Sequence, residues 1–185
     1  MPILEPEPSV FPEDLLAPTS EVDVERRWWA VYTKARQEKA LARDLFARQI
    51  PFYLPMVPRN SLIRGRRVES LLPLFRGYVF VFSREDERVE TLRTNRVSQL
   101  IEVADQEKLC ADLWQVQQLI ARRAPFVVEA RLVPGRRVRV KSGAFMGIEG
   151  VVEQQRSGYR LIVEVAFLQQ SVSVELDETL VEQID

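Results

Sequence analysis

The chain has 185 residues, of which 46% are hydrophobic and 29% charged, as is ordinary for one medium or two small globular domains. Its single cysteine, Cys110, has no second cysteine for an intrachain disulfide, and the absence of histidine removes the partners that a zinc site or a Cys-His nucleophile requires. No apolar run reaches the roughly 18 residues that span a bilayer. The N-terminus has no basic region ahead of an apolar one. We therefore expect a cytoplasmic binding protein without membrane segment, metal or cofactor, rather than an enzyme.

The formal net charge of −1 hides three segments of different charge. Residues 1–25 carry seven acidic residues, no basic residue and five of the eleven prolines, which predicts a disordered acidic tail. Residues 26–67 carry eleven basic and two acidic residues, a net charge of +9, while residues 68–185 carry −3. A block of +9 is typical of a surface that binds a polyanion, although solvated arginines on a helix and a hairpin fit the same count.

Residues 26–124 predict an α/β sandwich with helices packed against a sheet, because runs of aromatic and β-branched residues alternate with helical periodicity. Prolines flank the short segment at 52–57, which favours the edge of the sheet, whereas the continuously apolar segment 77–82 is typical of a central strand. The expected elements are strands at 28–33, 52–57, 77–82 and 97–103, a hairpin at 61–72 with its turn at 64–66, and helices at 36–49, 85–92 and 105–123.

After a linker at 125–133, residues 134–185 predict a small all-β barrel. Five of the seven glycines fall in this stretch, among valine-rich segments, which is typical of short strands joined by tight turns. The expected strands lie near 138–140, 150–152, 161–165, 171–176 and 180–181.

Two motifs stand in the order and spacing of one known family. The first, Pro73-Leu-Phe-Arg-Gly-Tyr-Val-Phe-Val81, begins about forty residues after an aromatic strand that ends in Tyr32-Thr33. The second runs from Gly135 to Val152, with turn glycines at Gly143, Gly147 and Gly150, and is followed by Val-Glu-Leu-Asp at 174–177. The first resembles the Pro-Leu-Phe-Pro-Gly-Tyr-Val signature of the NusG N-terminal (NGN) domain, and the second resembles a KOW motif.

The resemblance identifies the chain as a member of the NusG family. It implies an NGN domain at 26–124, which is an α+β sandwich with an antiparallel sheet flanked by helices, and a small all-β SH3-like KOW barrel at 134–185. The length and the segment Lys-Ala-Arg-Gln-Glu-Lys at 34–39 resemble the specialised RfaH-like paralogues more than housekeeping NusG.

The resemblance implies a polymerase-binding surface of aromatic residues. In the family, an aromatic hollow on the NGN domain binds the clamp helices of the largest subunit of RNA polymerase, and the matching positions are Tyr32, Phe75, Tyr78 and Phe80. Tyr78 and Phe80 are two residues apart, so a strand points them to the same face. Aromatic residues on a central strand are usually core, so a purely structural role fits the pattern too. Arg76 stands where the family has proline.

The basic segment supplies a second expected surface, at Lys34, Arg36, Lys39 and Arg43. The last three are three and four residues apart and share one face of the predicted helix. The resemblance implies that this region faces upstream or non-template DNA. Three further arginines, Arg64, Arg66 and Arg67, surround the predicted hairpin turn, where phosphate contacts and plain solvation are equally open.

For the barrel, the resemblance implies a second partner, either the termination factor Rho or a small-subunit ribosomal protein. The matching positions are Phe145, Ile148, Phe167 and Leu168, although Phe145 and Phe167 fit a barrel core equally well. Some specialised relatives hold this domain as a helical hairpin. Here the density of valine and glycine favours strands, so we expect a β-structure at rest.

The function that the resemblance implies is that of a monomeric elongation factor, which binds RNA polymerase and regulates pausing, termination and antitermination. The alternative is a KOW-type RNA-binding or ribosome-associated protein that uses the barrel as its main surface. An enzyme would have to use carboxylates such as Glu85, Asp86 and Glu87. Adjacent acids at a helix start point in different directions and complement the helix dipole instead.

Overall fold

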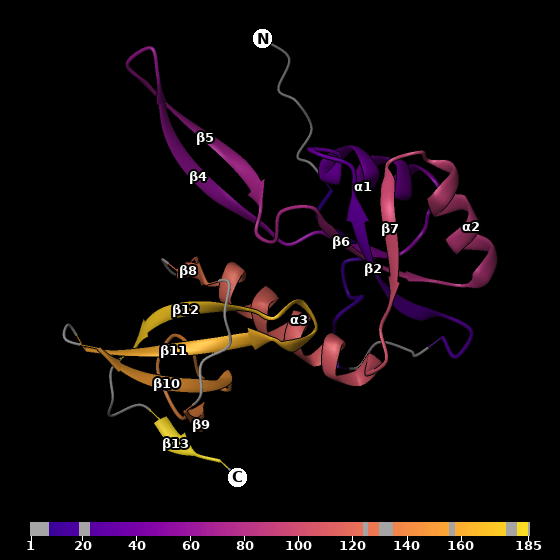
Figure 1. Ribbon diagram of the computed structural model, residues 1–185. Coiled ribbons are helices and arrows are strands. Elements are labelled where there is room, and N and C mark those ends of the chain that lie inside the picture. Colours follow the sequence, from indigo (N-terminus) through magenta and orange to yellow (C-terminus); the bar gives the residue numbers. More distant parts are fainter. Residues whose placement is uncertain are drawn as a thin grey trace. The chain divides into compact units, whose positions relative to one another are not determined.

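The computed structural model describes residues 8–18, 23–123, 126–129, 135–155, 158–176 and 181–184. The chain divides into two units, Met1–Gln106 and Glu107–Asp185, and Figure 1 labels most of their elements. The first unit contains β1 (Val10–Phe11), β2 (Arg27–Thr33), α1 (Glu38–Ala47), β3 (Phe52–Tyr53), β4 (Met56–Ile63), β5 (Arg66–Pro73), β6 (Tyr78–Ser83), α2 (Glu85–Arg93) and β7 (Val97–Glu102). Helix α3 (Gln106–Ala121) begins at Gln106, the last residue of the first unit, and continues into the second unit.

The second unit continues from α3 with strands and one short 3-10 helix. They are β8 (Phe126–Glu129), β9 (Arg136–Val140), β10 (Glu149–Gln155), β11 (Gly158–Val165), η1 (Ala166–Leu168), β12 (Gln170–Leu176) and β13 (Val181–Gln183). The unit boundary lies ahead of α3, so the domain limits expected from the sequence, 26–124 and 134–185, stay a prediction.

The sheet of the first unit has the order β1-β3-β6-β2-β7, and its recorded strand pairs are antiparallel. Strand β6 lies in the middle, which confirms the central position expected from its continuous apolar run. It pairs with β2 from Arg27 opposite Ser83 to Tyr32 opposite Tyr78. The mixed α-and-β character expected of this part of the chain is confirmed.

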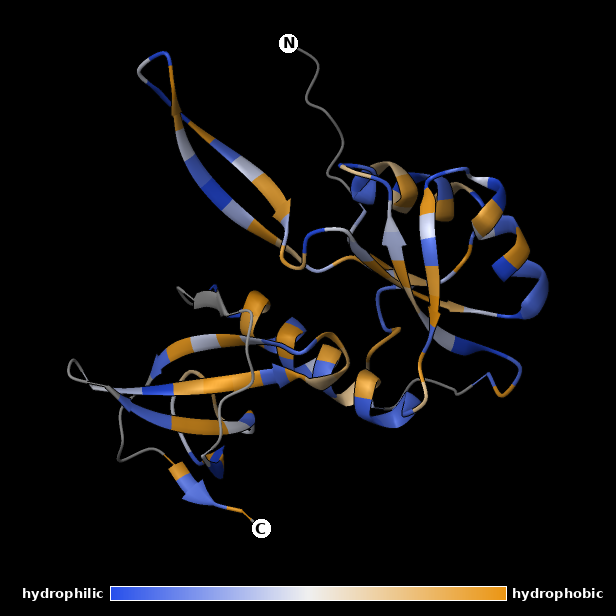
Figure 2. Ribbon diagram, viewed as in Figure 1, coloured by the Kyte–Doolittle hydropathy of each residue, from blue (hydrophilic) through white to orange (hydrophobic). Residues whose placement is uncertain are grey.

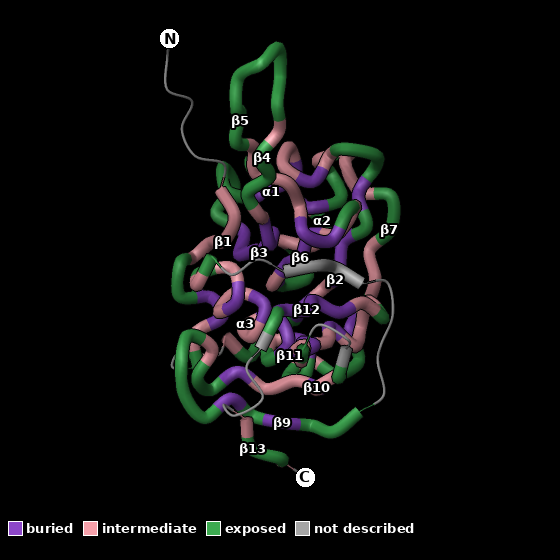
Figure 3. Tube along the Cα trace, turned by 90° about the vertical axis from the view of Figure 1, so that its left-hand side faces the viewer, coloured by how far each residue is buried: buried purple, intermediate pink, exposed green. Residues whose placement is uncertain are grey.

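One face of this sheet packs against α1. Leu41, Ala42 and Leu45 of the helix form a buried cluster with Val31 and Val79 at the centre of the sheet. The spacing of the helical residues places them on one stripe, and the alternation along each strand turns the valines to the same side. Burying a leucine side chain of this kind contributes roughly 1.5–3 kcal/mol. Figure 3 shows the buried segments gathered in the sheet and the adjoining faces of its helices.

The prediction of a disordered tail over residues 1–25 is wrong for the part that the structure describes. Val10 and Phe11 form β1, which pairs with β3, and Leu16 is buried with 2% exposure. The ring of Phe11 meets Phe46 of α1 edge-on, with 5.4 Å between ring centroids. The charge and proline content of the tail gave no sign of these apolar contacts. They depend on the open edge of β3, which composition does not reveal.

Strand β3 is likewise not the edge strand that its flanking prolines suggested. It pairs with β6 on one side and with β1 on the other. The prediction rested on the flanking prolines and took no account of the segment at 10–11, which pairs with β3. The edge position belongs to β1 instead.

Strands β4 and β5 form a two-stranded sheet of their own, which extends away from the five-stranded sheet in Figure 1. The expected hairpin is confirmed, with longer strands than the sequence indicated. Its turn consists of Arg64 and Gly65, both with positive φ, at 50° and 77°. Positive φ at both turn residues is the geometry that joins antiparallel strands by two residues without splaying them.

The second unit contains a six-stranded sheet in the order β13-β9-β10-β11-β12-β8, and each recorded strand pair is antiparallel. Five of its strands lie where the valine-rich segments predicted them. The sixth, β8, falls inside residues 125–133, which the sequence assigned to a linker. The part of the chain from 135 onward was weighed between strands and a helical hairpin; among its described residues, the regular elements are strands β9–β13 and the short helix η1 between β11 and β12. Closure of this sheet into an SH3-like barrel stays a prediction.

Gly150 allows β10 to lie close to β11. A Cβ at this position would stand 2.4 Å from the carbonyl oxygen of Ile162, which belongs to the backbone of β11. The other two turn glycines act through conformation, since Gly143 and Gly147 both have a φ of 86° in the loop between β9 and β10. The loop is fixed by two backbone hydrogen bonds, from Gly147 N–H to Val140 O at 2.9 Å and from Val140 N–H to Ile148 O at 2.9 Å.

We predict that Gly150→Ala lowers the free energy of unfolding of the full chain by about 2 kcal/mol or more, because a backbone carbonyl cannot rotate away as a side chain can. Urea unfolding followed by circular dichroism measures the change. Ser142→Ala in the neighbouring exposed loop serves as the control. Equal stability of the two variants would contradict the close approach of β10 and β11.

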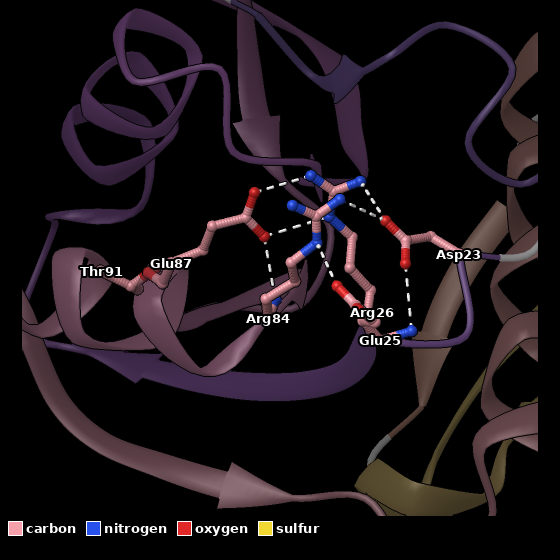
Figure 4. A network of polar contacts seen from close by, with 6 residues as sticks. All are labelled: Asp23, Glu25, Arg26, Arg84, Glu87 and Thr91. Atoms are coloured by element: carbon pink, nitrogen blue, oxygen red, sulfur yellow. Dashed lines mark hydrogen bonds and ion pairs between the residues drawn. The ribbon is translucent and has the colours of Figure 1, made fainter.

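Figure 4 shows an ionic network that joins the segment before β2 to the start of α2. Arg26 donates to both carboxylate oxygens of Glu87, from Nη2 at 2.7 Å and from Nε at 3.0 Å. Asp23 Oδ2 accepts from Arg26 Nη1 at 2.9 Å and from Arg84 Nη2 at 2.8 Å. Glu87 also accepts from the backbone N–H of Arg84 at 2.9 Å, which caps the helix. Within the first unit, the network therefore joins residues 23–26 to the start of α2.

These contacts lower the pKa values of both acids. The hydrogen bond from Arg84 is the main cause that holds the pKa of Asp23 below its usual range. For Glu87, burial acts to raise the pKa, but the hydrogen bonds from Arg26 and from the backbone of Arg84 outweigh it, and the pKa is lowered.

A lowered pKa in the folded state adds stability above the ordinary carboxylate pKa of about 4.3, and this stability is lost as the pH falls through the folded value. We therefore predict that Glu87→Gln costs stability at pH 7 and that the difference from the native protein shrinks below about pH 4. Urea unfolding across this pH range measures it, with the exposed Glu13→Gln as control. A pH-independent difference would contradict the role of the ionised carboxylate.

Candidate functional site

Two of the four expected polymerase-binding aromatics form one surface, which we call the tyrosine platform. Tyr32 on β2 lies directly opposite Tyr78 on β6, and their ring centroids are 5.3 Å apart with an angle of 54° between the rings. Tyr32 is 42% exposed and Tyr78 is half-buried. Two rings held against each other on adjacent strands offer a large apolar area together with hydroxyl groups, the combination that favours protein interfaces.

The other two aromatics are not surface residues. Phe75 is 1% and Phe80 0% exposed, so neither is available to a partner in this structure. The sequence pattern predicted that Tyr78 and Phe80 share a face of β6, but a shared face does not give shared exposure. The expectation that all four aromatics line one accessible hollow is therefore corrected to the tyrosine platform, with Phe75 and Phe80 beneath the surface.

Gly77 holds the platform in place. Its φ is 84°, and a Cβ added to it would lie 2.7 Å from Cε2 of Tyr32, so the ring of Tyr32 rests against the glycine backbone. The carbonyl of Gly77 accepts from Thr33 N–H at 2.8 Å, and its own N–H donates to Glu38 Oε1 at 2.7 Å. Glu38 is the first residue of α1 and is only 9% exposed. One buried carboxylate therefore ties the helix start to the turn that carries the platform.

The basic residues follow the platform directly along the chain. Lys34 and Arg36 are exposed in the loop between β2 and α1, while Lys39 is half-buried and Arg43 exposed on α1 itself. Lys34 Nζ donates to Asn95 Oδ1 at 2.8 Å. The prediction that Arg36 shares a helix face with Lys39 and Arg43 is wrong, because α1 begins at Glu38 and Arg36 has a φ of 60°.

Sequence reasoning missed the residues that fix this loop. Arg96 donates from Nε to Asp44 Oδ2 at 2.5 Å and from Nη1 to Gln37 Oε1 at 2.6 Å, while its backbone carbonyl accepts from Lys34 N–H at 2.8 Å. The start of β7 is thereby joined to α1 and to the loop before it. No local sequence pattern predicts that Arg96 fixes this loop, because its partner Asp44 is 52 residues away in the chain.

In the second unit, one of the four expected partner-binding residues is buried and the other three are partly exposed. Ile148 is fully buried at 0% exposure and belongs to the core, which corrects its assignment to a surface. Phe145, Phe167 and Leu168 are half-buried, the first in the loop before β10 and the other two in η1. The N–H of Ala166, at the start of η1, donates to Asp112 Oδ2 of α3 at 3.1 Å.

The comparison with known families matches a family described as transcription termination factor NusG to residues 26–118, just over half of the chain. The chain belongs to the NusG family. The matched range contains the tyrosine platform, Gly77, Glu38 and all four expected DNA-facing bases. NusG-family proteins are transcription factors without catalytic activity, and they interact with RNA polymerase.

The NusG match leaves β1 and the strands of the second unit outside its range. A solved structure of NusG from Thermotoga maritima, concerned with its domain interaction, is similar over 86% of this chain and 98% of that chain, with 17% sequence identity and a TM-score of 0.44. Within the described residues, no helix is long and apolar enough to cross a bilayer. The described part of the chain also holds no group of three His, Cys, Asp or Glu residues placed to bind a metal ion.

We predict that Gly77→Ala displaces the Tyr32 ring from Tyr78 and destabilises the protein, by about 1–2 kcal/mol for the positive φ alone. Gly65→Ala is a matched control, because Gly65 has a similar φ of 77° and a Cβ added there would have no atom within 4 Å. Nuclear Overhauser contacts between the two tyrosine rings measure the effect. Retention of these contacts in Gly77→Ala would contradict the supporting role of Gly77.

Proposed function

We propose that this NusG-family protein is a transcription elongation factor that binds the clamp helices of the largest RNA polymerase subunit through the tyrosine platform. The observation that carries the proposal is the paired rings of exposed Tyr32 and half-buried Tyr78, at the family's polymerase-binding positions, with the Tyr32 ring resting against Gly77. An interface anchor needs a rigid aromatic group that loses little entropy on binding. Cross-strand pairing and the contact with Gly77 give Tyr32 that rigidity.

The four bases at Lys34, Arg36, Lys39 and Arg43 extend the same proposal to upstream or non-template DNA. Lys34 and Arg36 lie within four residues of Tyr32, so a polymerase-bound platform would hold them at most about 14 Å along the chain from the contact. Phosphate contacts from these side chains would add affinity that falls with salt. The factor would act as a monomer in the cytoplasm.

The mechanism that we propose is a shift of population, not a chemical step. A protein that binds the closed, active clamp more tightly than the paused state favours elongation by that difference in binding free energy. A difference of about 1.4 kcal/mol would change pause occupancy roughly tenfold. Whether the outcome is termination or antitermination would depend on the partner of the second unit, either Rho or a small-subunit ribosomal protein, bound through Phe145, Phe167 and Leu168.

We predict that Tyr32→Ala/Tyr78→Ala weakens binding to a reconstituted RNA polymerase elongation complex at least tenfold, as expected for two interface anchors. Phe46→Ala is the control, since Phe46 is an aromatic residue of α1 with a similar exposure of 46%. Phe80 is unsuitable for this test because its removal would disturb the core.

Free structured RNA is added as competitor in the same binding assay. Binding that depends on the tyrosines and survives the competitor supports the elongation factor. Unchanged binding by Tyr32→Ala/Tyr78→Ala would refute the platform. Binding abolished by free RNA would favour the alternative, a KOW-type RNA-binding protein.

A further inference from the structure

The β4–β5 hairpin is the most exposed part of the first unit. Its eight residue pairs run from Met56 opposite Pro73 to Ile63 opposite Arg66, a length of about 26 Å at 3.3 Å per residue. Residues 62–69, which include the turn, are all exposed, as the tube in Figure 3 shows. Only the base of the hairpin reaches the core, through Met56 and Leu71, so the exposed residues 62–69 take no part in it. Their composition therefore requires another explanation.

The strand register sorts the side chains of the hairpin onto two faces. Residues directly opposite each other point to the same side, and successive residues alternate. One face, which we call the Arg59/Arg66 face, has two arginines and no acid; its members are Val57, Arg59, Ser61, Ile63, Arg66, Val68, Ser70 and Leu72. The opposite face places Arg67 and Glu69 together. The sequence alone does not reveal this separation, because it depends on the register.

The hairpin arginines differ from most others in their partners. Arg26, Arg84, Arg88, Arg96 and Arg139 each form an ion pair with a carboxylate. Among the residues that the structure describes, no ion pair involves the hairpin arginines, which are Arg59, Arg64, Arg66 and Arg67. Four like charges on one small ribbon repel one another, and this repulsion is relieved when a polyanion binds.

The exposed aliphatic residues narrow the choice of polyanion. On the Arg59/Arg66 face, Ile63 is 54% and Val68 38% exposed, and Figure 2 shows apolar segments interrupting the hydrophilic hairpin; Leu62, 74% exposed, lies on the opposite face. Phosphate contacts alone give no reason for these side chains. Contact with the floor of a DNA groove does, because thymine presents an apolar methyl group in the major groove.

We propose that the Arg59/Arg66 face of the β4–β5 hairpin docks in the major groove of duplex DNA. The major groove of B-form DNA, about 12 Å wide, accepts a two-stranded β-ribbon, whereas the deep and narrow major groove of A-form RNA does not. Arg59 and Arg66 stand four residue pairs apart along the ribbon, about 13 Å, which corresponds to roughly four base pairs. Ile63 and Val68 lie on the same face, where their side chains would contact the bases of the docked duplex.

This docking goes beyond the proposed function, because it requires neither the tyrosine platform nor RNA polymerase. The bases near α1 and the hairpin arginines belong to different elements, so their contributions to DNA binding are separable by substitution. The hairpin determines which nucleic acid is bound, since only its two-stranded shape distinguishes a B-form groove from an A-form one.

The test measures binding of the full chain to a labelled B-form DNA duplex of about 20 base pairs, close to two helical turns. The same sequence as single-stranded DNA and the corresponding RNA duplex are measured beside it, over a series of salt concentrations. Arg66→Gln and Arg67→Gln form a matched pair, because they are adjacent residues with the same change of charge on opposite faces. We expect Arg66→Gln to weaken binding to the DNA duplex about tenfold and to lower its salt slope by about 1, with a clearly smaller effect of Arg67→Gln.

A second matched pair tests the apolar contact. Ile63→Ser on the Arg59/Arg66 face should weaken duplex binding without changing the salt slope, whereas Leu62→Ser on the opposite face should leave it near the native value. Equal effects of Arg66→Gln and Arg67→Gln, equal binding of DNA and RNA duplexes, or no binding of duplex DNA would each overturn the proposal. Circular dichroism and polymerase binding of the same variants show that fold and platform are intact, so this failure is distinguishable from failure of the platform.

Discussion

The antiparallel pairing of β2 with β6 is the interaction on which both the core and the candidate site depend. In this pairing Val31 lies opposite Val79, and both belong to the cluster buried against α1. One residue further along, Tyr32 lies opposite Tyr78 and the pair reaches solvent. A slip of one residue in one strand would bring its tyrosine to the α1 face and remove its valine from the core. The register that forms the core therefore also forms the platform.

Gly77 and Glu38 connect this strand pair to the basic loop that follows it. The positive φ of Gly77 turns the chain into β6, and its missing Cβ leaves room for the Tyr32 ring. Glu38 accepts the Gly77 N–H from the first turn of α1, where a carboxylate also complements the helix dipole. The hydrogen bonds of Gly77 to Glu38 and to Thr33 thus position the tyrosine platform and the start of α1 together.

Ion pairing divides the cations of the basic segment by their availability. The guanidinium of Arg26 is held by two carboxylates, and Arg48 lies 3.8 Å from Glu90. These guanidinium groups would have to leave their carboxylate partners to bind phosphate, at little cost for the exposed Arg48–Glu90 pair. Arg59 and Arg66, by contrast, stand on an acid-free face of the hairpin. The count of +9 over residues 26–67 therefore overstates the charge that a polyanion would meet.

The sequence by itself determined the elements whose signals are local. Periodicity and turn residues were sufficient for the central strand β6, for the β4–β5 hairpin with its turn near Gly65 and for five strands of the second unit, since each is encoded by residues close together in the chain, whereas β8 was assigned to a linker. The two motifs were likewise sufficient for the family. Only the tertiary structure decided that Val10 and Phe11 extend the sheet and that Phe80 and Ile148 are buried. These outcomes depend on partners distant in sequence. The periodicity of a segment shows which residues share a face, but not which other segment covers that face.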